Sequence, residues 1–438
     1  MQIWNSCKSD RFDAVKYRNR VLGLVILLSL ITYLDRVCIS VAGPRIQDAL
    51  KIGPAAWGWV TGVFVISYAV FEIPMGILGD RIGPRRVLTR IVLWWSVFTT
   101  LTGVVTGYYP LLLTRLLFGA GEAGAYPNTS IVVARWFPVD ERGRAFGAIT
   151  MAGQIGGAVA PLLVVPIQIH YGWRACFYVF GVLGVVWSGI WYGWFRDTPA
   201  QKQGVGAAEI AEAPVTLAAH QKLPWIQALR SMNVWAVLAV ALCYMYTYYF
   251  FQSWFHTYLV KARGFDEKSL LLSSLPYVVA ACANISGGLL SNALVKRFGL
   301  RWGRCSIGFI SLGFACLCTI AVMVTQGQVT ALILLAAVYG GITFQQPIMF
   351  AVCLDIGGPY AGAMVGAMNT SAQIGAFVSS LSFGFLVERY SNYNLPFIPM
   401  ALLLLAGATF WLKLDPTKQL IDTARVEDLG AAPARGTA

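Results

Sequence analysis

The chain has 438 residues, of which 57% are hydrophobic and only 12% are charged, and its mean hydropathy is +0.63. A soluble globular protein carries about 45–50% apolar and about 25% charged residues. This composition excludes cytosolic enzymes, nucleic-acid binders and disordered scaffolds. The apolar runs are long and continuous, which excludes an outer-membrane barrel with its alternating strands. The remaining class is an all-α integral membrane protein.

Apolar runs long enough to cross a bilayer recur along the whole chain. One span needs about 20 apolar residues, and we predict twelve transmembrane helices. We expect the first to be retained rather than cleaved as a signal, because it contains Asp35 and Arg36 and has no small-residue cleavage site. The predicted spans are 21–42, 57–79, 87–107, 110–134, 144–168, 173–195, 233–258, 269–294, 303–325, 329–352, 360–387 and 394–413.

The net charge of +13 is distributed unevenly over the connections between these spans. The two tails and the connections after even-numbered spans hold 24 Lys and Arg residues, whereas the connections after odd-numbered spans hold 7. Connections rich in Lys and Arg stay on the cytoplasmic side. We therefore expect both termini to be cytoplasmic, in a cell inner membrane.

Two halves of the sequence resemble each other. The run Gln-Ile-Gly at 154–156 recurs 219 residues later at 373–375, and Pro127 corresponds to Pro347. Two six-helix pseudo-repeats with a binding site at the midplane are typical of secondary transporters. The predicted parts are an N-tail at 1–20, a six-helix bundle at 21–195, a cytoplasmic linker at 196–232, a second bundle at 233–413 and a C-tail at 414–438.

Ionisable side chains within the predicted spans all belong to the first half. Each costs about 2.5–3.5 kcal/mol at the bilayer centre and marks a functional site by default. A buried ion pair that only fastens helices is the alternative. Arg115 and Glu122 lie about 10.5 Å apart along one helix, so we expect each to meet another helix or a ligand. The set comprises Asp35, Arg36, Glu72, Arg115 and Glu122.

The charges of this set suggest coupling to protons. With all five groups ionised the set carries a net charge of −1, and a bound monocarboxylate would make it −2 in a medium of low dielectric. Burial and like charge both favour the protonated carboxyl group. Protonation of Asp35 and Glu122 would restore neutrality. Tyr68 shares a helix face with Glu72, as a ligand or as a packing tyrosine.

The second half offers uncharged hydrogen-bonding groups within its spans. Such an array suits a polyhydroxy substrate, and hydrogen bonding between helices is the alternative, worth about 0.6 kcal/mol per pair. These groups are Asn284, Ser286, Thr343, Gln345, Gln346, Asn369, Thr370 and Gln373.

Chemistry beyond transport finds little support in the residue pattern. The nine cysteines are scattered through apolar runs without the spacing of a zinc site. The three histidines lie near span ends or in the linker, and no paired nucleophile and base is evident. We expect no enzyme activity, no metal and no cofactor.

One loop motif resembles the signature of the major facilitator superfamily. Residues 76–86 read Gly-Ile-Leu-Gly-Asp-Arg-Ile-Gly-Pro-Arg-Arg, and Arg115-x3-Gly119-x-Gly121-x-Ala123 resembles the motif of the fourth helix. In that family the acid and arginines form a cytoplasmic latch that stabilises the outward-open state. In the second half Asn292 stands where the acid belongs. The resemblance implies a latch made of Gly76, Asp80, Arg81, Gly83, Arg85 and Arg86.

A finer resemblance is to the anion:cation symporter family, especially its bacterial galactonate, hexuronate and glucarate permeases. It rests on Tyr-Leu-Asp-Arg at 33–36, Phe-Glu-Ile-Pro at 71–74, Gly-Glu-Ala-Gly-Ala-Tyr-Pro at 121–127 and Trp-Phe-Pro-x2-Glu-Arg-Gly at 136–143.

This resemblance implies roles for individual side chains. Asp35 and Glu122 would be the proton-coupling acids. Arg36 would bind the substrate carboxylate, and Arg115 would interact with Glu122. Glu72 is not assigned by the resemblance; from its position near the end of the second span we expect it to support the charge pairs by tying helices together, with a proton site as the alternative. The residues implied to hydrogen-bond the substrate are Tyr33, Tyr68, Gln154 and Asn369.

Taken together, the residues and the resemblance predict a monomeric proton-coupled symporter. It would import a small organic anion, such as a hexonate, hexuronate or aldarate, by alternating access. Its partners would be the anion, protons and the lipid bilayer, with no nucleic acid. The alternative is an organic-anion or phosphate-ester exchanger or facilitator that is not coupled to protons.

Overall fold

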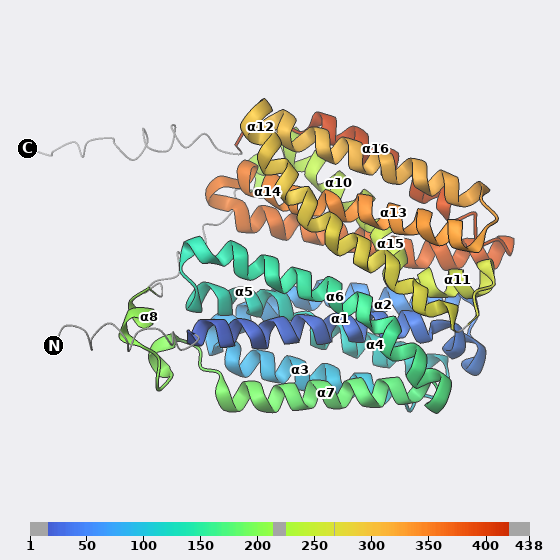
Figure 1. The fold of residues 1–438 in the computed structure, drawn as a ribbon, viewed down its shortest axis with the longest axis horizontal. Helices are drawn as coiled ribbons and strands as arrows, with labels where there is room; N and C mark the ends of the chain where they lie inside the picture. The colour runs from blue at the N-terminus through green and yellow to red at the C-terminus, as the bar shows by residue number, and fades with distance from the viewer. Residues whose placement is uncertain (1–15, 213–224, 267, 420–438) are drawn as a thin grey trace, which may run out of the picture. The chain divides into compact units, whose positions relative to one another are not determined.

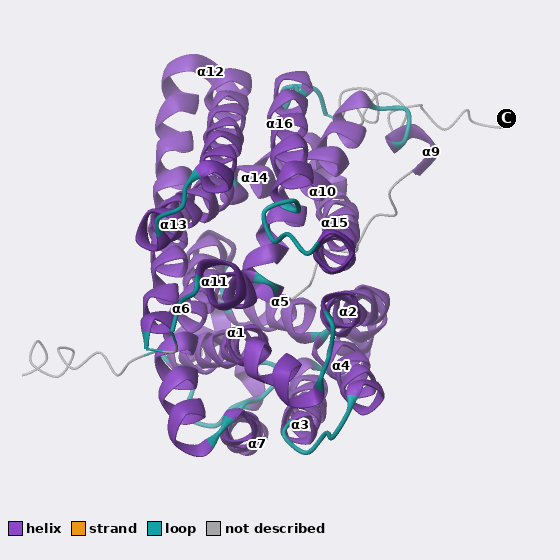
Figure 2. Cartoon of the chain, turned by 90° about the vertical axis from the view of Figure 1, so that its right-hand side faces the viewer, coloured by secondary structure: helices purple, strands orange, loops and turns teal. Residues whose placement is uncertain are grey.

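A computed structural model describes residues 16–212, 225–266 and 268–419. Every regular element in these ranges is a helix (Figure 2). The elements are α1 Tyr17–Leu50, α2 Pro54–Ile82, α3 Pro84–Thr102, α4 Tyr108–Glu122, α5 Ala125–Trp136, α6 Val139–Tyr171, α7 Trp173–Trp194, η1 Pro199–Gln201, α8 Ala207–Glu212, α9 Trp225–Ala228, α10 Met232–Ser253, α11 Phe255–Arg263, η2 Ser269–Ser274, α12 Leu275–Val324, α13 Gln328–Phe344, α14 Gln346–Gly357, η3 Gly358–Tyr360, α15 Ala361–Tyr390 and α16 Phe397–Lys413.

The predicted all-helical membrane fold is confirmed, although length and hydropathy alone single out eight helical segments of the described chain as spans. The other predicted spans do not meet this criterion of length and hydropathy, for local reasons. The fourth is divided into α4 and α5, the twelfth is the 17-residue α16, and the third, α3, begins with charged Arg85, Arg86 and Arg90. The eighth and ninth are joined in α12, whose backbone leaves the helical region at Gly299, with φ 80°.

Two predicted spans are interrupted at matching positions. The fourth breaks between Glu122 and Ala125, and the tenth breaks at Gln345. Each break lies just before a proline, Pro127 or Pro347. A proline lacks the N–H that would continue the helix, and its ring clashes with the carbonyl four residues earlier. The sequence thus interrupts each helix next to a buried polar side chain, Glu122 in one and Gln345 in the other.

Packing divides the described chain into two compact units. Unit 1 holds the chain up to residue 212 together with Phe250–Val278 and Ser380–Tyr393, and unit 2 holds the other described residues. In unit 1, α1 packs against α6 and α7, and α3 packs against α7 (Figure 1). The predicted bundle limits at 195 and 233 stay a prediction. Both predicted tails, and the predicted linker at 196–232, lie partly outside the described residues.

The repeated Gln-Ile-Gly run has the same packing role in each unit. A Cβ on Gly156 of α6 would lie 2.6 Å from the carbonyl oxygen of Leu30 on α1. A Cβ on Gly375 of α15 would likewise clash with the carbonyl oxygen of Leu242 on α10. Small residues allow membrane helices to approach this closely. The sequence repeat is therefore also a repeat of helix packing.

Candidate functional site

An ion pair between two sequence-distant helices forms the centre of the candidate site. Nε of Arg36 on α1 donates to Oε1 of Glu122, the last residue of α4. The Glu122 side chain is 1% exposed and the Arg36 side chain 21% exposed. Glu122 is the last residue of α4, so its carboxylate lies at the point where the helix breaks.

Aromatic rings surround the Arg36 guanidinium. Its central carbon lies 4.8 Å from the ring centroid of Tyr68, 5.4 Å from that of Phe64 and 5.9 Å from that of Tyr33. A guanidinium within about 6 Å of a ring is attracted by the ring quadrupole, most strongly when water is excluded. The predicted residues Tyr33 and Tyr68 therefore lie at the Arg36 head group.

The same Phe64 ring also faces the second arginine. The Arg115 guanidinium lies 4.4 Å from the Phe118 centroid and 5.6 Å from the Phe64 centroid. Neither phenylalanine was predicted to belong to the site. Their positions gave a usable signal, because Phe64 is four residues before Tyr68 and Phe118 is three after Arg115, each on the same helix face.

Unpartnered polar atoms lie buried next to this pair. Asp35 is 3% exposed, and neither of its carboxylate oxygens has a hydrogen-bond partner among the described residues. The same holds for Oε2 of Glu122 and for Oε1 of Gln154, which is 2% exposed. Asp35 interacts electrostatically with Glu122 and Arg115. Buried polar groups without partners are rare and point to a ligand or a proton.

Two further predicted site residues are half-buried. Glu72 on α2 interacts electrostatically with Arg36 and Tyr68 but forms no ion pair with a described residue. Asn369 is half-buried on α15, which at this point belongs to unit 2. Gln154 lies beside the cluster, because its neighbour Gly153 is so close to the Tyr33 ring that a Cβ there would approach it within 2.7 Å.

Some polar residues of the second half form hydrogen bonds between helices, which was the alternative to substrate binding. Nδ2 of Asn284 on α12 lies 3.3 Å from Oε1 of Gln346 and 3.5 Å from the carbonyl oxygen of Thr343. The Thr343 hydroxyl donates to backbone carbonyls. Gln345, at the break between α13 and α14, is buried with no hydrogen-bond partner for its amide among the described residues.

The predicted latch residues divide into two groups. The first packs tightly. Gly83 has φ +88°, and its backbone approaches the Asp197 carboxylate so closely that a Cβ would clash. Gly76 is also close-packed, since a Cβ there would lie 3.2 Å from the Pro127 side chain. The Arg85 N–H donates to Asp197 Oδ1 at 2.8 Å, and its guanidinium donates to the Tyr192 carbonyl at 2.6 Å.

The second group is exposed. Asp80, Arg81 and Arg86 lie at the surface where α2 ends and α3 begins. Their side chains form no hydrogen bond or ion pair among the described residues. The acid of the loop is therefore available to a partner that this conformation does not provide.

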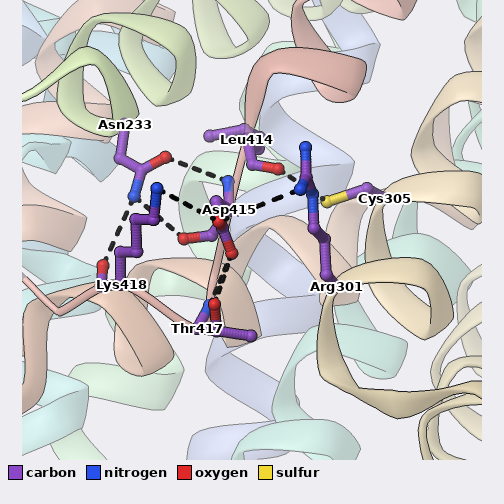
Figure 3. A network of polar contacts seen from close by, with 7 residues as sticks. All are labelled: Asn233, Arg301, Cys305, Leu414, Asp415, Thr417 and Lys418. Carbon is purple, nitrogen blue, oxygen red and sulfur yellow. Dashed lines mark hydrogen bonds and ion pairs between the residues drawn. The ribbon is translucent and has the colours of Figure 1, made fainter.

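In unit 2, Asp415 follows the last helix and contacts an arginine, as Asp197 does in unit 1. Asp415 faces Arg301 at 4.0 Å, and its backbone N–H donates to Asn233 Oδ1 at 2.9 Å (Figure 3). The Thr417 hydroxyl donates to the Asp415 carboxylate at 2.5 Å and lowers the pKa of that carboxyl below its ordinary value. Asp415 stands 218 residues after Asp197, so both halves fasten the end of their last helix with an aspartate.

We expect Asp415→Asn to lower the midpoint of thermal unfolding in detergent at pH 7. A carboxyl whose pKa is lowered by folding stabilises the protein above its unfolded pKa of about 4, and this contribution is lost as the pH falls through the folded pKa. The difference in midpoint between wild type and variant should therefore narrow as the pH drops below 4. A difference that is independent of pH would contradict this assignment.

Comparison with known proteins decides the family. The family model described as Major Facilitator Superfamily matches residues 25–380, which is most of the chain. The chain belongs to the Major Facilitator Superfamily. It is thus a multi-pass membrane transporter and not an enzyme, as predicted.

Individual relatives of this superfamily chain align over nearly their full lengths. A probable sulfoacetate transporter of Cupriavidus necator is 34% identical over 92% of this chain and 95% of its own. A hexuronate transporter of Bacillus subtilis is 27% identical, over 86% of this chain and 90% of its own. A bacterial homologue of the human lysosomal transporter Spinster, solved inward-facing and occupied, shares the fold with TM-score 0.75 at 19% identity, covering 91% of this chain and 96% of its own.

Proposed function

We propose that this chain is a proton-coupled symporter that imports a small organic anion by alternating access. The observation that carries the proposal is the buried Arg36–Glu122 pair, with the unpartnered Asp35 beside it. An arginine provides a forked set of donors that matches a carboxylate or sulfonate. Two buried acids close to it provide sites that a proton can neutralise.

The pair itself suggests how the anion and the proton depend on each other. Arg36 cannot give its Nε–H to a substrate anion while Glu122 holds it. Breaking a buried ion pair without compensation costs about 3–5 kcal/mol. A proton on Glu122 removes its negative charge and releases Arg36 to the substrate. Substrate binding is then favourable only after protonation, which is the condition for coupled transport.

The substrate class follows from the site and from the names of relatives. One relative is named as a hexuronate transporter and another as a probable sulfoacetate transporter, and both of these substrates are small hydrophilic anions. Arg36 and Arg115, both lined by aromatic rings, would bind the anionic group. Hydroxyl groups of a sugar acid would bind Tyr33, Tyr68, Gln154 and Asn369. We propose a monomer in a bacterial inner membrane with both termini in the cytoplasm.

Proton entry into proteoliposomes that contain a trapped pH dye tests this function. Hexuronate, galactonate, an aldarate and sulfoacetate are added outside one at a time. We expect one of these anions to acidify the lumen and to accumulate against its own gradient. Liposomes without protein, and protein with a neutral sugar, are the controls. Entry of radiolabelled anion without acidification would instead identify an exchanger or facilitator of organic anions or phosphate esters.

A further inference from the structure

A buried histidine that the transport site does not use links three segments of unit 1. His256 on α11 has no exposed surface. Its Nδ1 lies 2.9 Å from the Ser40 hydroxyl on α1, and its Nε2 lies 3.0 Å from the Ser273 hydroxyl on η2. Helix α11 lies next to α1 (Figure 2). Ser40 stands 216 residues before His256, whereas Ser273 stands 17 residues after it, so the imidazole links α1 to a distant part of the chain.

The hydrogen bonds determine which ring nitrogen carries the proton. The Ser273 hydroxyl donates its proton to the Leu270 carbonyl at 2.5 Å. Its oxygen must therefore accept from His256 Nε2–H. In the neutral ring Nδ1 is then the acceptor, and the Ser40 hydroxyl donates to it. Both ring nitrogens are satisfied, which is what a fully buried imidazole requires.

Further contacts surround the histidine at this end of unit 1. Gln47 donates to the Thr257 hydroxyl at 3.0 Å, and Lys261 pairs with Asp48 at 2.8 Å. The Asp48 side chain is 70% exposed, and an ion pair so open to water contributes little. The Gln47–Thr257 hydrogen bond and the two His256 hydrogen bonds are buried, so these are the contacts of the region that are most costly to leave unmade.

Ser40 connects this region to the transport site. It lies four residues after Arg36 on α1, one helical turn and about 6 Å along the axis. Residues four apart share a helix face. A movement of α1 that accompanies substrate binding at Arg36 therefore moves Ser40 relative to the imidazole.

We propose that His256 is a positioning residue that pins α1 to α11 and η2, and that this end of unit 1 opens during transport by breaking the Ser40–His256 hydrogen bond. The proposal rests on the chain being a transporter and not on its coupling to protons. Failure of the coupling experiment would therefore leave it standing. Opening separates α1 from α11 and exposes residues of α1 that are now buried.

A cysteine reporter in purified protein tests the pin without any substrate. Ile46 on α1 is fully buried at this end, so Ile46→Cys should react slowly with a hydrophilic maleimide. The exposed Cys282 is replaced by Ser in every variant to reduce background. Loss of one hydrogen bond shifts an opening equilibrium about fivefold. We expect Ser40→Ala and His256→Gln each to raise the labelling rate by about that factor.

Two controls separate the pin from general loosening of the fold. Ser40→Thr keeps the hydroxyl and should label like the parent. Ser29→Ala removes another buried hydroxyl of α1, one bonded to the Ile149 carbonyl, and should not raise labelling. The double variant Ser40→Ala/His256→Gln should label no faster than His256→Gln alone, because His256→Gln already breaks the bond that Ser40→Ala removes. Parent-like labelling in both folded single variants would overturn the proposal.

Uptake kinetics supply a second measurement, in which a positioning role of His256 gives a different result from a purely structural one. If the pinned end opens more readily, the half-saturating anion concentration on that side and the maximal uptake rate should both fall. The pattern is expected for His256→Gln and Ser40→Ala but not for Ser29→Ala. Equal loss of maximal rate in all three, with unchanged half-saturation, would show a merely structural role.

Discussion

Glu122→Gln is expected to abolish proton-driven accumulation of the substrate, with coupled uptake falling about a hundredfold or more. The amide keeps the size of the carboxyl and can still accept from Arg36 Nε, but it neither carries a proton nor balances the arginine charge. Leaving one partner of a buried ion pair uncompensated costs about 3–5 kcal/mol. Accumulation in proteoliposomes under an imposed pH gradient measures the loss.

Glu72→Gln is the matched control for this change. It makes the same chemical substitution in the same half of the chain, but Glu72 is half-buried and acts on Arg36 only electrostatically, without an ion pair among the described residues. We expect its uptake to stay within about threefold of wild type. Lumen acidification by Glu122→Gln at the wild-type rate would refute the coupling role of Glu122.

Asp35→Asn complements this experiment because Asp35 has no hydrogen-bond partner to lose among the described residues. An asparagine in its place should leave the thermal midpoint unchanged, whereas Glu122→Gln should lower it. Proton entry should nevertheless stop in both variants. Exchange of labelled for unlabelled substrate at equal pH needs no net proton movement and should persist in Asp35→Asn.

Gly287→Ala is expected to be the most disruptive single methyl group in unit 2. A Cβ on Gly287 of α12 would fall well inside the van der Waals radius of the Phe344 carbonyl oxygen on α13. A backbone carbonyl cannot rotate away like a side chain, so the two helices must separate. Overpacking of this kind costs about 1–3 kcal/mol or more. The thermal midpoint in detergent should fall by several degrees.

The neighbouring glycine provides a control within the same helical turn. A Cβ on Gly288 would meet only the Pro347 side chain, at the ordinary contact distance of 3.8 Å. Gly288→Ala removes the same helix-weakening residue type and should be neutral or slightly stabilising. If both alanine variants unfold at the same temperature, close approach of α12 and α13 is not what Gly287 provides.

The fold was largely predictable because a bilayer admits few structures. Lipid supplies no hydrogen bonds, so long apolar runs must become helices. The helix breaks at Glu122–Ala125 and at Gln345 were not predicted, although Pro127 and Pro347 follow them in the sequence. A proline inside an apolar run can bend, break or be absorbed by a helix, and neighbouring helices decide which.

The site was predictable as a set of residues but not as a set of contacts. Charged residues within apolar runs can be recognised as candidate site residues, because placing a charge in the bilayer costs free energy. Which guanidinium meets Glu122 depends on how α1 crosses α4, and spacing along one helix carries no such information. Phe64 was not singled out, because an aromatic residue in a span usually serves packing. His256 was passed over as lying near a span end, since nothing local shows that Ser40 and Ser273 approach it.

The neutrality of the central cluster has an electrical consequence. Asp35, Arg36, Arg115 and Glu122, when all are ionised, sum to zero charge, so under the proposed mechanism the empty carrier would reorient without doing work against the membrane potential. Each proton on an acid adds one positive charge, worth about 2.3 kcal/mol per 100 mV. With both acids protonated, a monoanion leaves one net positive charge to be driven inward by the voltage, whereas a dianion leaves none. The same cluster would thus take up a hexuronate with the help of the membrane potential and an aldarate without it.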